Sequence, residues 1–191
     1  MDVAEQAQQS ATAPGASTPE LVHAELVKAG VRLVVTIPDS KTNTLYRLIT
    51  GDPRIKTVRV AKEDEGVGIC CGAYFGGVHS CLFMANAGLM VSCYPLATLS
   101  MFHRIPFFML IGNRGTLGDN AHFQEYQGLL THKMLEAMGV STWTVAEASQ
   151  AGVVSKAFKY SRLYKRAAAV LLEGDAFDES GGFRFLKPGT I

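Results

Sequence analysis

The sequence predicts an α/β domain in which a doubly wound, six-stranded parallel sheet carries helices on both faces. Runs of β-branched and apolar residues, such as 31–37 and 106–111, are apolar on both sides, as expected of buried parallel strands. Segments with helical signals alternate with these runs. Six strand-then-helix units with right-handed crossovers leave a doubly wound sheet as the main arrangement.

The alternation continues along most of the chain. Ser17, Thr18 and Pro19 have the pattern of a helix start, which predicts a first helix over about 19–28 that Gly30 ends. The predicted strands span about 31–37, 57–61, 80–84, 106–111, 142–145 and 168–172. The other predicted helices are one that ends near 49 and those over about 63–76, 89–102, 129–138 and 148–164.

The two ends of the chain differ from the middle. Residues 1–17 are rich in Ala, Gln, Ser and Thr, and we expect them to form a disordered tail. Residues 18–175 are expected to form the domain, and 176–191 a C-terminal extension.

Composition and charge restrict the classes of function. The chain has 191 residues and a formal net charge of +1, so no basic face indicates binding to nucleic acid. Only 18% of the residues are charged and 48% are hydrophobic, which favours a surface that another subunit partly covers. No apolar run reaches the ~20 residues that span a bilayer, and the N-terminal segment lacks the apolar core of a secretory signal. We therefore expect a cytoplasmic protein without membrane contact.

The four cysteines, Cys70, Cys71, Cys81 and Cys93, form no CxxC pair and have no histidine cluster at zinc spacing. They are interpreted as small buried hydrophobic residues in a reducing compartment, and no metal site is predicted on this chain.

Ligand chemistry in doubly wound sheets lies beyond the carboxyl ends of the strands. One segment there, 62–66, opens a helix with three acids, Glu63, Asp64 and Glu65. Acids in a first helical turn are ordinarily explained by the positive end of the helix. The same helix contains glycines at 66, 68 and 72, and each interior glycine costs roughly 1 kcal/mol. We expect them to allow close approach of another helix or of a cofactor.

Residues 63–74 resemble the glutamate helix of the pyrimidine-binding domains of thiamine-diphosphate enzymes, in which Gly follows a Glu by nine positions. Glu63 and Gly72 have that spacing, and Glu65 does not. The segments 37–40, 85–89 and 111–115 resemble, in the expected order, three motifs of sulfopyruvate and phosphonopyruvate decarboxylases. The chain is thereby identified as similar to the pyrimidine-binding (alpha) subunit of a two-subunit thiamine-diphosphate-dependent decarboxylase.

The resemblance implies roles for particular residues. Glu63 would be catalytic: its carboxyl group would meet N1′ of the aminopyrimidine and promote formation of the ylid. Pro38, Gly88 and Leu89 would also contact the cofactor. The implied substrate residues are Asp39, Ser40, Asn86, Arg114 and His122.

Each of these side chains also has an ordinary explanation. Residues 38–40 could simply form a turn, and Asn86 could cap a helix. Arg114 could form a surface ion pair, and His122 could be merely exposed on a long loop.

The sequence lacks the Gly-Asp-Gly motif with which such enzymes bind Mg²⁺ and the diphosphate. Gly118-Asp119-Asn120 and Gly174-Asp175-Ala176 are too isolated to replace it. The resemblance therefore implies a second subunit that brings the metal and diphosphate site, in a hetero-oligomer such as α2β2 or larger. The glycine-rich helix would then pack at the subunit interface.

Our main hypothesis is a lyase subunit that decarboxylates a short 2-oxo acid with an anionic tail. Met90, Val91 and Tyr94 are bulkier or more apolar than the residues of the related decarboxylases, and Asn113 stands in place of a tryptophan. These departures allow a carboligase or lyase that acts on a less polar substrate. A non-catalytic regulatory subunit of the same fold is a second alternative. A nucleotide-binding flavodoxin-like domain ranks last, because no GxGxxG or GxxxxGK[ST] loop is present.

Overall fold

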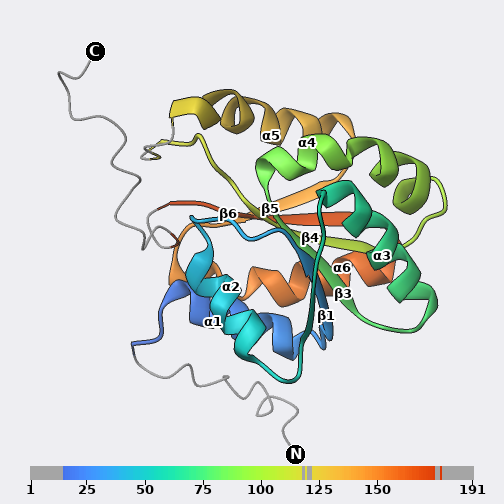
Figure 1. Cartoon of the computed structure of the whole chain (residues 1–191), viewed down its shortest axis with the longest axis horizontal. Coiled ribbons are helices and arrows are strands. Elements are labelled where there is room, and N and C mark those ends of the chain that lie inside the picture. Colours follow the sequence, from blue (N-terminus) through green and yellow to red (C-terminus); the bar gives the residue numbers. More distant parts are fainter. Residues whose placement is uncertain (1–14, 118, 120–121, 175–176, 178–191) are drawn as a thin grey trace, which may run out of the picture.

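A six-stranded, all-parallel sheet runs through the centre of the molecule in the computed structural model, which describes residues 15–117, 119, 122–174 and 177 (Figure 1). The strand order is β2-β1-β3-β4-β6-β5. The strands are β1 (Leu33–Thr36), β2 (Lys56–Arg59), β3 (Ser80–Ala85), β4 (Phe107–Gly112), β5 (Ser141–Val145) and β6 (Ala167–Leu172). The α-helices are α1 (Thr18–Lys28), α2 (Asn43–Gly51), α3 (Glu63–Phe75), α4 (Asn86–Pro95), α5 (Glu125–Ala137) and α6 (Val153–Tyr164). The predicted fold class is confirmed.

Two helical layers cover the sheet. One core cluster joins α1, α2 and α6 to the sheet through residues such as Val22, Leu45 and Phe158. The other joins α3, α4 and α5 through residues that include Val67 and Leu89. Neighbouring residues of β1, β3, β4 and β6 alternate between the two clusters, because successive side chains of a strand point to opposite faces. The helices lie below and above the sheet in Figure 1.

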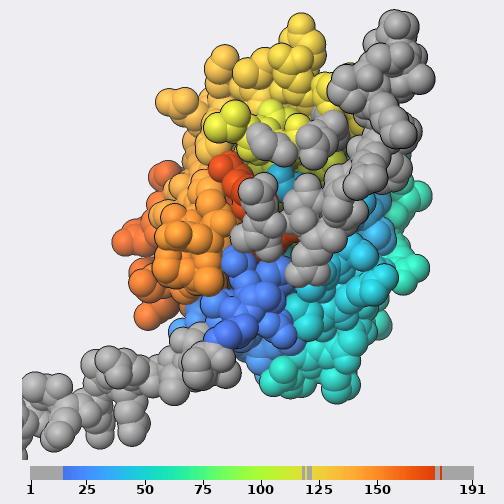
Figure 2. Space-filling model, turned by 90° about the vertical axis from the view of Figure 1, so that its left-hand side faces the viewer, coloured from blue at the N-terminus to red at the C-terminus, as the bar shows by residue number. Residues whose placement is uncertain are grey.

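The strand order changes direction beside β1. The chain passes from β1 to β2 on one side, and β3 then pairs with β1 on its other side. In parallel sheets this change opens a crevice outside the carboxyl ends of the two strands, where ligands bind. Figure 2 looks onto this carboxyl-end edge, with α1 and α2 below and to one side and α5 above.

The helix predicted over 89–102 differs most from the structure. It begins earlier, at Asn86, and continues after Pro95 as a π-helix, η1 (Leu96–Met101). Pro95 has no amide hydrogen, so it cannot donate the regular i→i−4 hydrogen bond. The helix predicted from 129 likewise begins earlier: a 3₁₀ turn, η2 (His122–Gln124), leads into α5 at Glu125. The helix predicted over 148–164 is divided into a 3₁₀ turn, η3 (Ala148–Gln150), and α6.

Cys70, Cys71 and Cys81 are buried and Cys93 is partly buried, in agreement with their interpretation as core residues. None of the helices in the described part of the chain is long and apolar enough to cross a membrane. Most of the predicted tail and extension, residues 1–14, 176 and 178–191, lies outside the described residues.

Candidate functional site

Glu63 is the first residue of α3, directly after the connection from β2 at the carboxyl-end edge of the sheet. Its side chain is partly buried and lies against the backbone of Gly88 in α4. A Cβ atom added to Gly88 would lie 2.4 Å from Glu63 Cγ and 2.7 Å from Glu63 Oε1. Any side chain at position 88 would therefore displace the carboxyl group, so Gly88 is required for the observed position of Glu63.

The three acids at the start of α3 have different surroundings. Asp64 pairs with Lys62 at 3.2 Å. Glu65 Oε2 accepts a hydrogen bond from the amide of Ala61 at 3.0 Å, which satisfies a free donor just before the helix. Within the described part of the chain, Glu63 makes no hydrogen bond and no ion pair. Of the three acids in this turn, Glu63 is therefore the one whose carboxylate is available to bind a group from outside the chain.

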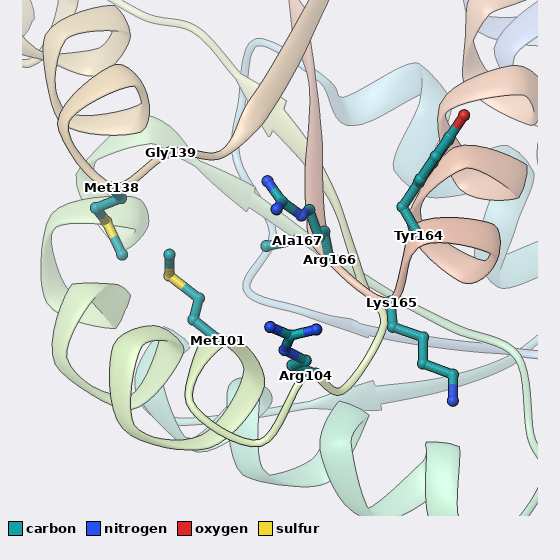
Figure 3. Close-up of a pocket in the computed structure, with 8 residues that line it drawn as sticks. All are labelled: Met101, Arg104, Met138, Gly139, Tyr164, Lys165, Arg166 and Ala167. Atoms are coloured by element: carbon teal, nitrogen blue, oxygen red, sulfur yellow. The ribbon is translucent and has the colours of Figure 1, made fainter.

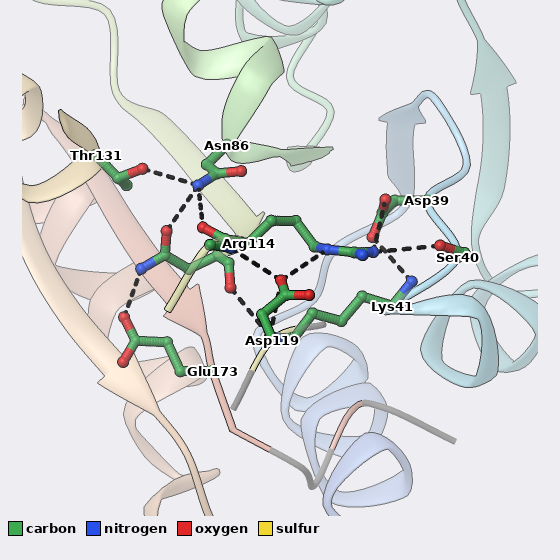
Figure 4. A network of polar contacts seen from close by, with 10 residues as sticks. Asp39, Ser40, Lys41, Asn86, Arg114, Asp119, Thr131 and Glu173 are labelled. Atoms are coloured by element: carbon green, nitrogen blue, oxygen red, sulfur yellow. Dashed lines mark hydrogen bonds and ion pairs between the residues drawn. The ribbon is translucent and has the colours of Figure 1, made fainter. Parts of the chain in front are cut away.

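Arg114 lies just after β4 and faces the loop that follows β1 (Figure 4). Its Nε donates to Asp119 Oδ2 at 3.0 Å. Its Nη1 donates to Ser40 Oγ at 3.2 Å and lies 3.5 Å from Asp39 Oδ1. Residues that are 74 positions apart in the sequence are therefore in contact at the ends of two strands.

Lys41 completes this group of charges. Its side chain is only 5% exposed, and its Nζ donates to the carbonyl oxygen of Asn113 at 3.1 Å and lies 4.0 Å from Asp119 Oδ2. The amide of Lys41 donates to Asp39 Oδ2 at 3.0 Å. Two cations are thus balanced by two carboxylates, as buried charges require. The group fixes the loop after β1 against the loop after β4.

Asn86 is fully buried behind this group. Its Nδ2 is 2.9 Å from Asn113 Oδ1, 2.9 Å from the carbonyl of Arg114 and 3.0 Å from Thr131 Oγ1. Asn113 in turn donates to Glu173 Oε1 at 2.7 Å. The side chain does not cap α4, whose N-cap is Ala85. Asn86 Oδ1 is buried without a hydrogen-bond partner among the described residues. Asn86 connects the ends of β3 and β4 to the middle of α5.

The remaining candidates lie apart from these contacts. Pro38 is exposed, whereas Leu89 is fully buried in the layer formed by α3, α4 and α5. His122 is exposed on η2, with its ring against Phe123 at 5.8 Å between centroids. No contact joins His122 to Glu63 or Arg114 in the described part of the chain.

Comparison with known proteins shows relatives of similar length. The sulfopyruvate decarboxylase subunit alpha of Methanothermobacter thermautotrophicus is 30% identical over 155 residues, which cover 81% of this chain and 94% of the relative. That of Methanococcus maripaludis is 32% identical over 121 residues, which cover 63% of this chain and 72% of the relative. The chain belongs to the family of sulfopyruvate decarboxylase alpha subunits. The phosphonopyruvate decarboxylase of Streptomyces viridochromogenes is 30% identical over 114 residues, or 59% of this alpha-subunit homologue and 29% of that protein. No family model matches the chain.

In this alpha-subunit homologue, the structure brings the residues singled out from sequence into two groups. Glu63 and Gly88 touch, and Asp39, Ser40 and Arg114 lie together. Their roles toward cofactor and substrate stay predictions.

Sequence reasoning missed five further members of the polar network, Lys41, Asn113, Asp119, Thr131 and Glu173. Lys41 could have been found from its place beside Ser40. Asp119 was considered only as part of a metal motif, and its pairing with Arg114 depends on how the loop after β4 folds.

Proposed function

We propose that this chain is the Glu63-bearing subunit of a thiamine-diphosphate-dependent 2-oxo acid decarboxylase. Membership of the sulfopyruvate decarboxylase alpha-subunit family supports the decarboxylase activity. The observation that carries the proposal is the Glu63 carboxylate, which is partly buried, lies against Gly88 and has no partner among the described residues. This is the arrangement that an acid needs in order to share a proton with a ring nitrogen brought in from outside.

The residues present fit the pyrimidine ring of thiamine diphosphate. Glu63 would share a proton with the ring nitrogen N1′, and the close contact with Gly88 leaves the carboxyl group few other positions. A hydrogen bond of this kind is stronger in a closed site than in water. The family resemblance also assigns cofactor contacts to Pro38 and to Leu89, which follows Gly88 in α4. Once bound, the cofactor supplies the carbanion chemistry, and the protein supplies position and electrostatics.

The loops after β1 and β4 would bind the substrate. Asp119 holds Arg114 through Nε, so the Nη end of the guanidinium faces Ser40 and Asp39. That end could bind the acidic group of a short 2-oxo acid, because guanidinium and carboxylate or sulfonate groups match in geometry. Asn86 would support the site from behind, and His122 would act at its rim as a proton carrier.

A second subunit would supply Mg²⁺ and the diphosphate site. The relatives are named as alpha subunits, and the sequence given contains no Gly-Asp-Gly motif. The outer face of the α3–α4 layer is also suited to a partner. Gly68 and Gly72 have nothing within 4 Å of an added Cβ, and Tyr94 and Phe102 are 79% and 78% exposed. Apolar groups exposed together on one face commonly mark an interaction site.

The test is the substitution Glu63→Gln in the complex of this chain with its partner subunit, thiamine diphosphate and Mg²⁺. Decarboxylation of sulfopyruvate should fall by about 100-fold or more, because general acid–base groups contribute 10²–10⁴-fold. The matched control is Glu65→Gln, which alters a capping acid two residues away and should change turnover less than about threefold. Turnover by Glu63→Gln that stays within a few-fold of the unmodified complex would show that the catalytic assignment is wrong.

A further inference from the structure

A cavity of about 300 Å³ lies at the amino-end edge of the sheet, opposite the candidate site (Figure 3). The residues around it come from the ends of η1, α5 and α6 and from the start of β6. It is lined by Met101, Arg104, Met138, Gly139, Tyr164, Lys165, Arg166 and Ala167. In a parallel α/β sheet these helix ends meet at the edge where the strands begin, so the cavity belongs to a different surface from Glu63.

The lining is strongly cationic. Arg104, Lys165 and Arg166 contribute three positive charges, and no carboxylate lines the cavity. None of the three side chains makes an ion pair or hydrogen bond with another described residue. In Figure 3 the side chains of Arg104 and Arg166 both extend over the cavity, whereas Lys165 points away from it. Both arginines line the same cavity, so an anion bound there would be attracted by both positive charges.

The backbone at the cavity is also unusual. Among the described residues, Arg104 with φ of 52° and Lys165 with φ of 49° are the two non-glycine residues with positive φ. Side chains with a Cβ atom disfavour this left-handed conformation, and elsewhere in the chain glycines such as Gly139 adopt it. Such outliers concentrate at functional sites. Arg104 stands in the turn that ends the helical segment after η1, in which the amide of Ile105 donates to the carbonyl of Ser100 at 2.8 Å.

Helix dipoles offer a simpler explanation, since cations are favoured near helix C-termini. That explanation suits Lys165, which caps α6 and points away from the cavity. The helix dipoles alone do not explain why Arg104 and Arg166 line the same cavity. Arg166 lies beyond the end of α6, immediately before β6.

We propose that this cavity binds a tetrahedral oxyanion, a phosphate or a sulfonate, between Arg104 and Arg166. Guanidinium groups bind such anions through paired hydrogen bonds. The thioethers of Met101 and Met138 and the ring of Tyr164 form an apolar side that could hold the carbon part of a small organic anion. This site is separate from the proposed cofactor site and does not depend on the decarboxylase function.

The test is a titration of the full chain with inorganic phosphate at constant ionic strength, followed by NMR shifts and by the melting temperature. We expect saturable binding that Arg104→Gln or Arg166→Gln weakens by about tenfold. Lys165→Gln, the matched control, should weaken it less than about twofold. Both arginines are exposed, so neither variant should unfold the chain. Arg104→Gly is an independent variant that also removes the unfavourable φ: it should raise the melting temperature and still lose binding.

A parallel titration with phenyl phosphate distinguishes the two sources of the anion. Tighter binding than that of inorganic phosphate indicates a small organic ligand, and equal binding indicates free phosphate. Both results support the site. The absence of a saturable response to either probe overturns the proposal, as does equal weakening by Lys165→Gln and Arg104→Gln, which would indicate a diffuse basic surface.

Discussion

The two faces of α3 use glycine for different reasons. On the inner face, a Cβ added to Gly66 would lie 2.6 Å from Leu82 Cδ1 and 3.2 Å from Val35 Cγ1, so packing on the sheet explains this glycine. On the outer face, a Cβ at Gly68 or Gly72 would have nothing within 4 Å. Packing within this chain therefore requires a glycine at position 66, but it does not explain the glycines at positions 68 and 72.

This difference indicates which features belong to the chain and which to an assembly. A glycine in an exposed helix interior costs roughly 1 kcal/mol relative to alanine. This loss of helix stability at Gly68 and Gly72 is explained if the surface of another subunit packs closely against the helix. The first turn of α3 combines both situations, because Glu63 is positioned by Gly88 of its own chain but lacks a partner for its carboxylate.

The largest effect is expected from Gly88→Ala. The new methyl group would occupy the position of the Glu63 side chain, and displacement of a catalytic group by about 1 Å can reduce activity 100-fold. Turnover of the assembled enzyme should fall by about that factor, whereas the circular dichroism spectrum should stay unchanged. Gly51→Ala, a methyl addition of the same size at the end of α2 in the other layer, meets no atom within 4 Å and serves as the control. Full activity of Gly88→Ala would mean that the position of Glu63 is unimportant.

Opposite signs are expected from substitutions on the two faces of α3 in the isolated chain. Gly66→Val forces a branched side chain against the fully buried Leu82 and should lower the free energy of unfolding by about 2 kcal/mol. Gly72→Ala should raise it by roughly 0.5–1 kcal/mol, since alanine favours the helix and meets no neighbour. Urea unfolding measures both. The comparison breaks down if the two variants change stability in the same direction.

Substitutions on the outer face of α3 should affect mainly the association with the partner subunit. Gly72→Leu should weaken association with the partner subunit by about tenfold, because the larger side chain prevents close approach. Lys156→Leu, on the exposed face of α6 in the other layer, should leave association unchanged and is the control. Analytical ultracentrifugation of the mixed subunits gives both affinities. Equal affinities for Gly72→Leu and the unmodified chain would remove α3 from the proposed interface.

The smallest effect concerns the thiols of α3. Burial raises the pKa of Cys70 to about 12 and that of Cys71 to about 11. Both thiols are therefore protonated at pH 8, and only thiolates react readily with alkylating reagents. Mass spectrometry of the folded chain should show that iodoacetamide modifies the partly buried Cys93 before either of them. Labelling of Cys70 and Cys71 at the rate seen in urea would contradict the observed packing.

Hydrophobic pattern was enough to predict the sheet. Strands such as β4 and β6 are buried along their whole length, so their apolar runs are unmistakable. Helix starts were harder to predict from the sequence. Asn86 begins α4 directly at the end of β3, without the polar connection that usually marks a boundary. The resemblance assigned Glu63 and Gly88 to the same cofactor, and the contact between the two residues was not predicted.

The polar network was the least predictable part of the site. Lys41 was assigned no role, Asn113 was noted only as a departure from a related motif, and Asp119 only as part of an incomplete metal motif. Their pairing depends on strands that are distant in the sequence but adjacent in the sheet. Contacts between residues so distant in the sequence cannot be predicted from local sequence patterns.

Both ends of the described domain leave the molecule on the same side. The helix α1 begins, and β6 ends, at the carboxyl-end edge of the sheet, on the left in Figure 1. A fused protein joined directly to the described domain, at Ser17 or Gly174, would therefore be attached at the edge that carries Glu63. Tethers meant to leave Glu63 accessible belong in a loop at the opposite edge.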